Sequence, residues 1–195
     1  MQTITKEYKV FEFDELSDDV KQKVIEKYYD INVDFSDWYE FVIDDFKEQI
    51  KEKYGLDFDK EVYFDIEYRN RNLYFKKIWI DDIKKFIKGF KKDKIAKGDI
   101  NFSYKIAKAL KEEEIRIGFS EHREHTSIEY SDYTKNAITD KYKYLEDLQD
   151  WFNDNVVNAL LKRLTDEYEY LTSKESIIDT IKANEFKFLS DGERF

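Results

Sequence analysis

The chain has 195 residues, of which 41% are hydrophobic and 17% aromatic, and its formal net charge is −10. Each buried aromatic side chain removes about 150–250 Å² from water, so this composition supports a folded core and excludes a wholly disordered chain. The absence of cysteine excludes disulfides, thiolate metal ligands and a cysteine nucleophile. No signal peptide and no apolar run of about 20 residues is visible, and we expect a cytoplasmic protein without membrane contact.

Charge is distributed unevenly along the chain. Residues 14–48 carry 12 acidic and 4 basic side chains, residues 69–111 carry 4 and 14, and residues 112–195 carry 20 and 11. One interpretation is that the basic segment packs against the acidic parts and the charges offset within the fold. A second is an exposed basic face for nucleic acid or an acidic protein. A third is that the acidic faces imitate the phosphates of DNA before a basic protein channel.

The first part of the chain predicts one strand and two helices. Tyr8–Phe13 is rich in aromatic residues, which favours a strand. Ser17 is a predicted N-cap of a helix that continues to about Asp30. A second helix is expected from Ser36 or Asp37 to Gly55, with Phe41 broadening an apolar stripe. That stripe consists of Trp38, Val42, Phe46, Ile50 and Tyr54.

The middle of the chain predicts two hairpins and two helices. Residues 62–67 alternate as a strand, and Leu73–Ile80 returns as its partner after a turn at residues 70–72. Residues 81–91 fit an amphipathic helix, and a shorter helix is expected at residues 103–111. The second hairpin pairs a strand at residues 115–119 with residues 128–130, across a turn near residues 121–124.

The last part predicts two helices and a terminal strand. An apolar stripe runs through residues 139–170, Ser173 caps a further helix that closes at Asn184, and residues 185–189 follow as a strand. The predicted order is β-αα-ββ-αα-ββ-αα-β, an α+β class with antiparallel hairpins. We expect one domain over residues 1–195, with a two-lobe pseudo-repeat as an alternative and its boundary near residues 95–112.

Residues typical of catalysis and of metal binding are scarce. His122 and His125 are the two histidines, and Arg123 between them opposes a cation, so we expect a polar hairpin turn there. The chain has no phosphate-binding glycine loop and no nucleophile elbow. We therefore predict a non-enzyme without metal or cofactor. The three tryptophans are expected in the core; they are Trp38, Trp79 and Trp151.

Three segments follow a familiar pattern, and they are FDELSDDVKQKVIEKYYD (13–30), DWYEFVIDDFKE (37–48) and LKRLTDEYEYLTSKESIIDTIKANEFKFLSDGERF (161–195). They resemble the two ends of a phage and prophage accessory protein family, whose members are sometimes labelled antitoxin-like. The chain departs from the pattern at residues 68–73, where the family has a small Gly/Ser-rich stretch. The resemblance implies a mobile-element protein, and such proteins commonly bind and block host machinery, including CRISPR effectors.

These observations predict a protein that acts by binding a partner. The first hypothesis is an inhibitor of a host nucleic-acid-processing defence enzyme that uses acidic helix faces. Alternatives are an antitoxin-like neutraliser of a partner toxin, and a nucleic-acid-binding protein that uses the basic segment. The candidate residues of the acidic face are Asp18, Asp19, Asp37, Asp44, Asp45, Glu48, Asp147, Asp150 and Asp154, and those of the basic face are Lys84, Lys85, Lys88, Lys91 and Lys92.

Overall fold

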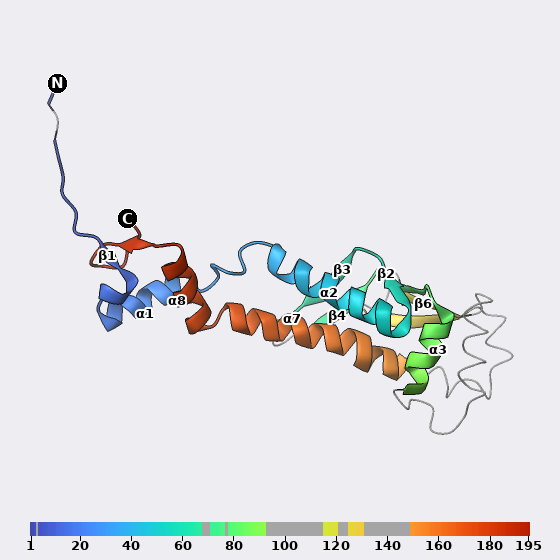
Figure 1. Ribbon diagram of the computed structural model, residues 1–195. Helices are drawn as coiled ribbons and strands as arrows, with labels where there is room; N and C mark the ends of the chain where they lie inside the picture. The colour runs from blue at the N-terminus through green and yellow to red at the C-terminus, as the bar shows by residue number, and fades with distance from the viewer. Residues whose placement is uncertain (3, 68–70, 77, 93–114, 121–124, 131–148) are drawn as a thin grey trace. The chain divides into compact units, whose positions relative to one another are not determined.

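The computed structural model describes residues 1–2, 4–67, 71–76, 78–92, 115–120, 125–130 and 149–195 (Figure 1). Its described residues form helices and two-stranded antiparallel sheets, which confirms the predicted α+β class. They divide into two compact units, residues 1–40 with 166–195 and residues 41–165. The boundary expected near residues 95–112 and the helix expected at residues 103–111 lie outside the described residues.

The first unit begins with strand β1 (Phe11–Glu12), which pairs antiparallel with strand β8 (Lys187–Phe188) from the other end of the chain. The predicted strand was longer, from Tyr8 to Phe13. It is cut short because a 3₁₀ turn, η1 (Phe13–Glu15), follows at once. The side chains of Glu12 and Glu15 form a capping box there, and the amide of Glu12 donates to Glu15 Oε2 at 2.8 Å.

Helices α1 (Asp18–Lys27) and α8 (Lys174–Ala183) complete this unit. Ser173 caps α8 as predicted, because its hydroxyl accepts a hydrogen bond from the amide of Ser176. Ser17 is the N-cap residue of α1, but its side chain makes no capping hydrogen bond. The apolar faces of the two helices meet the 3₁₀ turn and β8 in one core, which contains Phe13, Leu16, Val24, Ile25, Ile177, Ile181 and Phe188.

A polar side chain ties the segment after α1 to α8. The Asn32 amide donates to the carbonyl of Leu171 at 2.9 Å and to Ser176 Oγ at 3.0 Å. Its carbonyl accepts from the Thr180 hydroxyl at 2.7 Å. Because these contacts are partly buried, they replace water that the same groups would bind in the unfolded chain.

Substitution of Asn32 by alanine is expected to lower the free energy of unfolding by about 1–3 kcal/mol, because three polar partners lose a hydrogen bond. Urea unfolding measures the difference. The control is Gln22→Ala, which removes an exposed hydrogen bond to Glu26 within α1 and should change stability by less than about 0.5 kcal/mol. Equal midpoints for the two variants would contradict a structural role for Asn32.

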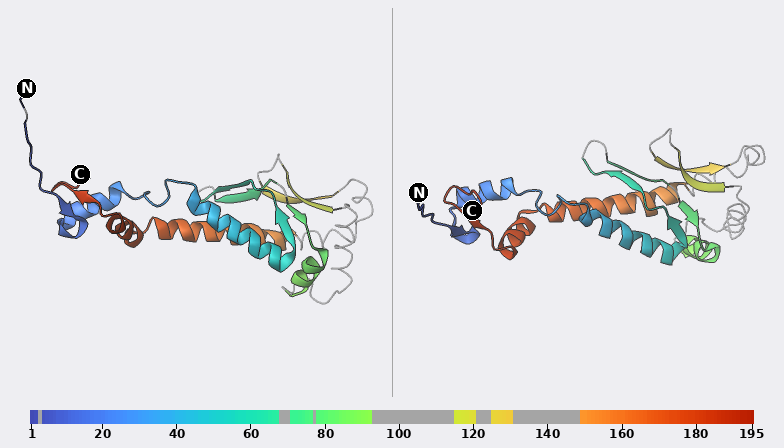
Figure 2. Two further views of the ribbon diagram at one scale, coloured as in Figure 1. Left: turned by 45° about the horizontal axis from the view of Figure 1, so that its top comes forward. Right: turned by 90° about the horizontal axis from the view of Figure 1, so that it is seen from above.

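The second unit contains a pair of antiparallel helices. One is α2 (Asp37–Tyr54), from residue 41 onward, and the other comprises residues 149–157 and the start of α7 (Asn158–Leu171). The rings of Tyr54 and Trp151 meet edge to face at 4.9 Å, while Arg163 contacts Asp45 from the other end of the pair. Figure 2 shows α2 and α7 side by side in both views, with the strands of this unit on one side of them.

A π-helical segment, Asn153–Val157, interrupts the helix that precedes α7. The amide of Asn158 bonds the carbonyl of Asn153, and the Asn155 side chain donates to the carbonyl of Trp151 at 3.0 Å. Residues spaced by four drift about 40° per step around an ideal helix of 3.6 residues per turn, and a wider turn corrects this drift. The predicted stripe therefore stays buried through the segment at Phe152, Val156, Leu160 and Leu164, whereas its last member, Tyr168, is half-buried.

The strands of the second unit differ from prediction in the partner of Ile78–Ile80 and in an additional strand. Strand β3 (Val62–Asp65) and strand β4 (Asn72–Phe75) form the expected hairpin. The predicted strand Leu73–Ile80 is broken, however, and its second part, β5 (Ile78–Ile80), pairs instead with β2 (Leu56–Phe58).

The break follows from the spacing of buried residues. Leu73, Phe75 and Ile78 are all buried. Side chains alternate across a strand, so an odd spacing between Phe75 and Ile78 cannot keep one face buried in a continuous strand.

Strand β2 was not predicted, because it starts directly after the helix-ending glycine. Gly55 has φ +64°, and the amides of Asp81 and Asp82 donate to its carbonyl at 2.8 and 3.1 Å. A Cβ at this position would lie 2.5 Å from the Asp82 carbonyl oxygen. Gly55 thus ends α2 as predicted and also brings β2 beside the end of β5.

Helix α3 (Ile83–Lys92) follows β5, and Asp82 caps it by accepting hydrogen bonds from the amides of Lys84 and Lys85. Strands β6 (Ile115–Ser120) and β7 (His125–Tyr130) form the second predicted hairpin, with Ile117 opposite Ile128. The residues of its turn, 121–124, lie outside the described ones.

Candidate functional site

One face of α2 combines an exposed aromatic ring with three carboxylates. Phe41, Asp44, Asp45 and Glu48 follow the i, i+3, i+4, i+7 spacing and lie on the same side of the helix. All four are exposed, and the Phe41 side chain reaches 77% exposure. We call these four residues the acidic aromatic face. With Lys47, Lys51 and Asp57 they line an open depression of about 500 Å³.

The two lysines beside this face are engaged within the fold. Lys47 Nζ donates to the carbonyls of Asp59 and Lys60 at 2.7 and 3.1 Å, and burial lowers its pKa. Lys51 Nζ pairs with Asp57 at 2.7 Å, and this hydrogen bond raises the pKa of Lys51. Because both cations bind groups of the β2 region, they leave the carboxylates of α2 facing solvent.

Arg163 from α7 offsets one of the three carboxylates. Its NH1 lies 3.3 Å from Asp45 Oδ2, its NH2 donates to Gln49 Oε1 at 2.6 Å, and its guanidinium stacks 5.1 Å from the centre of the Phe46 ring. Among the described residues, none forms an ion pair with Asp44 or Glu48. Two carboxylates of the face therefore keep their full negative charge.

Phe41 was missed as a site residue because the sequence placed it on the apolar stripe. The residues of α2 that are buried are Ile43, Phe46, Ile50 and Tyr54. Phe41 precedes Ile50 by nine residues, which is two and a half turns of about 3.6 residues, so it points to the opposite side. The spacing of nine residues between Phe41 and Ile50 places their side chains on opposite sides of the helix, so the exposure of Phe41 could have been predicted from the sequence.

The remaining acidic candidates lie outside this group of four residues, and Asp37 is the first residue of α2, four residues before Phe41. Asp18 and Asp19 are exposed in the first turn of α1, and Asp37 is exposed at the start of α2, all in the first unit. Asp150 and Asp154 are exposed before α7, and Asp154 accepts a hydrogen bond from the Asn158 amide at 3.4 Å. Asp147 lies outside the described residues. The structure thus brings together Asp44, Asp45 and Glu48, from one helix.

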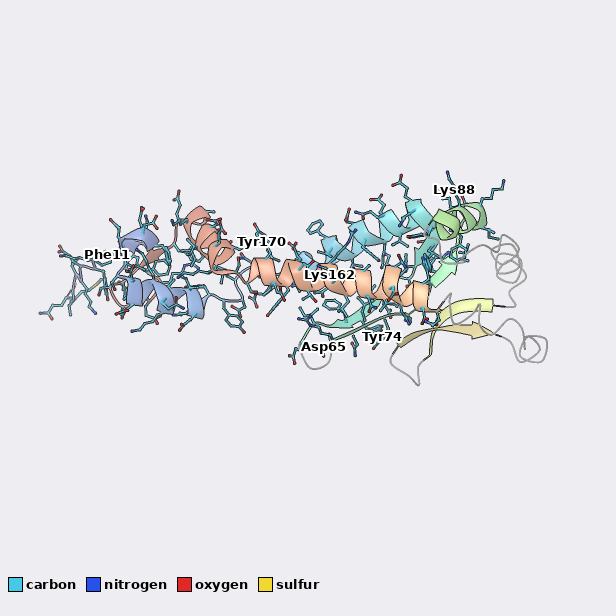
Figure 3. The ribbon with its side chains drawn as sticks, turned by 90° about the horizontal axis from the view of Figure 1, so that it is seen from below. Phe11, Asp65, Tyr74, Lys88, Lys162 and Tyr170 are labelled. Atoms are coloured by element: carbon cyan, nitrogen blue, oxygen red, sulfur yellow. The ribbon has the colours of Figure 1, made fainter. Side chains whose placement is uncertain are left out.

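The basic candidates lie on α3. Lys84, Lys85 and Lys88 are exposed, and no carboxylate of the described residues forms an ion pair with them. Figure 3 shows Lys88 projecting outward from α3. Lys91 and Lys92 are in the last turn of the helix, and their side chains are not described. The three described lysines are therefore not neutralised by docking on an acidic part of the described fold.

The described residues contain no cluster of three or more histidine, cysteine or acidic side chains that could hold a metal ion. His122 lies outside them, and His125 is the first residue of β7, whose side chains are not described. None of the helices in the described part of the chain is long and apolar enough to cross a bilayer. No family model, curated protein or solved structure matches this chain.

The Lys51–Asp57 pair predicts a pH dependence of stability. The hydrogen bond from Lys51 lowers the pKa of Asp57, so the pair stabilises the fold above the ordinary carboxyl pKa of about 3.9 and loses this effect as the pH falls through the lowered value. Asp57→Asn should reduce the free energy of unfolding by a fraction of a kcal/mol at neutral pH, as partly exposed pairs do.

Urea unfolding of both proteins across the acidic range tests this, and the difference between them should shrink below about pH 4. Glu52→Gln serves as control, since Glu52 is exposed and forms no ion pair with a described residue. A difference that stays constant down to pH 2, or grows, would contradict the assignment.

Proposed function

We propose that the chain is a stoichiometric inhibitor from a phage or other mobile element, which acts in the bacterial cytoplasm on a host nucleic-acid-processing defence enzyme. It binds through the acidic aromatic face and needs neither catalysis nor a cofactor. The observation that carries this proposal is the 77% exposed Phe41 beside Asp44 and Glu48, on a helix whose neighbouring lysines are directed into the fold. Aromatic side chains of this kind are frequent anchors of protein interfaces.

The charge spacing of the face suits a groove that normally holds a nucleic-acid strand. Asp44 and Glu48 lie about 6 Å apart along the helix axis, at 1.5 Å per residue. These two charges are thus spaced about 6 Å apart, close to every second phosphate of a DNA strand, which carries one charge per about 3.4 Å. Asp45, offset by Arg163, adds a partial third charge between them. A basic groove of an enzyme would therefore meet charge of the same sign at a lower density, while Phe41 supplies an apolar contact that phosphates lack.

Reversal of the two unpaired charges tests the proposal. The wild-type chain, used as bait in host lysate, should capture a nuclease or related effector and inhibit it at a one-to-one ratio. The D44K/E48K variant should bind that enzyme at least tenfold more weakly, since like charges across an interface destabilise it by several kcal/mol. Calorimetric affinity and residual nuclease activity are the measurements.

The matched control is E175K/D179K, which makes the same charge change at the same i, i+4 spacing on exposed positions of α8. It should retain capture and inhibition. Equal loss in both variants would show a response to net charge alone and contradict the site. Capture of a toxin that the chain neutralises would favour the antitoxin-like alternative instead.

The exposed lysines of α3 support a second candidate function, the binding of nucleic acid. That function predicts measurable affinity for DNA or RNA at low salt. It also predicts that the plot of log affinity against log salt concentration has a shallower slope in Lys84→Gln and Lys88→Gln than in the wild type. The inhibitor proposal predicts no such binding by the pure protein. A fluorescence anisotropy titration at low ionic strength separates the two, and a salt-dependent complex would favour the nucleic-acid function.

A further inference from the structure

The outer face of the β3–β4 hairpin carries three cross-strand pairs. Phe75 and Leu73 are buried on the inner face, so the alternate positions face outward. Tyr63 lies opposite Tyr74, and Asp65 lies opposite Asn72. Glu61 and Lys76 continue the ladder, because the amide of Lys76 donates to the carbonyl of Glu61 at 3.4 Å. Figure 3 labels Tyr74 and Asp65 on this hairpin.

The central pair forms a stacked aromatic surface. The rings of Tyr63 and Tyr74 have centroids 4.8 Å apart and an angle of 18° between their planes. Tyr63 is 45% exposed and lies on a strand of the two-stranded sheet β3–β4. The Tyr63 hydroxyl donates to Glu61 Oε2 at 2.9 Å, which fixes the direction of the ring. A planar group can therefore stack on a ring that is already oriented.

The charges around this pair are mostly negative. Glu61 lies on one side of the tyrosines and Asp65 on the other. Lys76 is the cation of the face, and its Nζ pairs with Glu61 at 2.7 Å. This contact lowers the pKa of Glu61, with the Tyr63 hydroxyl as a second cause, so Glu61 stays ionised over the physiological range.

We infer that this surface, the Tyr63–Tyr74 stack flanked by Glu61 and Asp65, binds an arginine side chain from an extended basic segment of a partner protein. The guanidinium is planar and can lie on the Tyr63 ring while it donates to a carboxylate at the edge. A nucleobase could also stack on tyrosine, but the phosphates attached to it would lie near the carboxylate of Asp65, which opposes binding, while Glu61 is paired with Lys76. A lysine ammonium has the charge but not the planar shape.

This site is separate from the acidic aromatic face of α2 and supplies a second contact of defined chemistry. It does not depend on the identity of the enzyme proposed above. The two surfaces are tested by different variants, so the failure of one leaves the other intact.

Two fluorescent peptides of equal length, one alternating arginine with glycine and one alternating lysine with glycine, are the probes. At physiological salt the arginine peptide should bind the wild-type chain more tightly than the lysine peptide. Tyr63→Leu should weaken arginine-peptide binding by about two- to fivefold, the range of exposed cation–π contacts, and remove the preference over lysine. Tyr63→Phe, which keeps the ring, should retain the preference.

Two further variants control the experiment. Tyr29→Leu and Tyr170→Leu each remove an exposed tyrosine of the first unit. Both should bind the arginine peptide as the wild type does. Equal affinity for the two peptides, an unchanged affinity in Tyr63→Leu, or displacement of the peptide by a short oligothymidylate would each overturn the inference. Circular dichroism of each variant confirms that it is folded before binding is measured.

Discussion

The packing of Trp151 against Tyr54 and Phe86 is the contact on which the rest of the second unit depends. Both rings meet Trp151 edge to face, at 4.9 and 5.9 Å, so one indole joins α2, α3 and the helix that leads into α7. Gly89 of α3 lies so close that a Cβ there would be 2.5 Å from the Tyr54 ring. This contact fixes the rotation of α2 about its axis, and the rotation decides which side chains of α2 reach solvent.

The electrostatic field at the surface of this unit comes mainly from charged side chains that form no ion pair within the fold. Lys47, Lys51 and Arg163 are held by partners within the fold, and none of them forms an ion pair with Asp44 or Glu48 among the described residues, although both lysines line the same depression. Lys84, Lys85 and Lys88 of α3 form no ion pair with another described residue and are exposed. The second unit thus presents separate acidic and basic surfaces, a bipolar distribution in which both the inhibitor and the nucleic-acid function have a physical basis.

Sequence periodicity predicted the helices and strands in which the spacing between buried residues is constant. It failed where that spacing changes within a run. The β3–β4 and β6–β7 hairpins, the end of α2 at Gly55 and the Ser173 cap were predicted from local patterns. The run from Leu73 to Ile80 has β-forming residues throughout, and propensity alone does not show that the buried positions Phe75 and Ile78 fall at an odd spacing. Its second half pairs with β2, a contact between distant residues that no local pattern contains.

The residues of the candidate site were likewise predicted only in part from local sequence patterns. Asp44, Asp45 and Glu48 were three of nine predicted acidic candidates, and all three are exposed on α2. Phe41 and Trp79 were assigned to the core on hydrophobicity, yet they are 77% and 40% exposed, while Trp151 is 3% exposed. Burial of an aromatic ring depends on the rotation of its helix or strand against a partner, and tertiary contacts set that rotation.

The chemistry of the acidic aromatic face also suits binding without catalysis. Aspartate has a short side chain with few rotatable bonds, so fixing it at an interface loses less conformational entropy than fixing a lysine or glutamate. Asp44 and Asp45 are carried by a helix whose opposite side is buried, and Arg163 and Gln49 hold Asp45 in place. A preorganised row of charges can match a basic groove with little rearrangement, whereas a catalytic site would need these carboxylates to converge on a substrate. Carboxylates that follow one helix face outward are therefore consistent with the proposed binding to an extended basic surface.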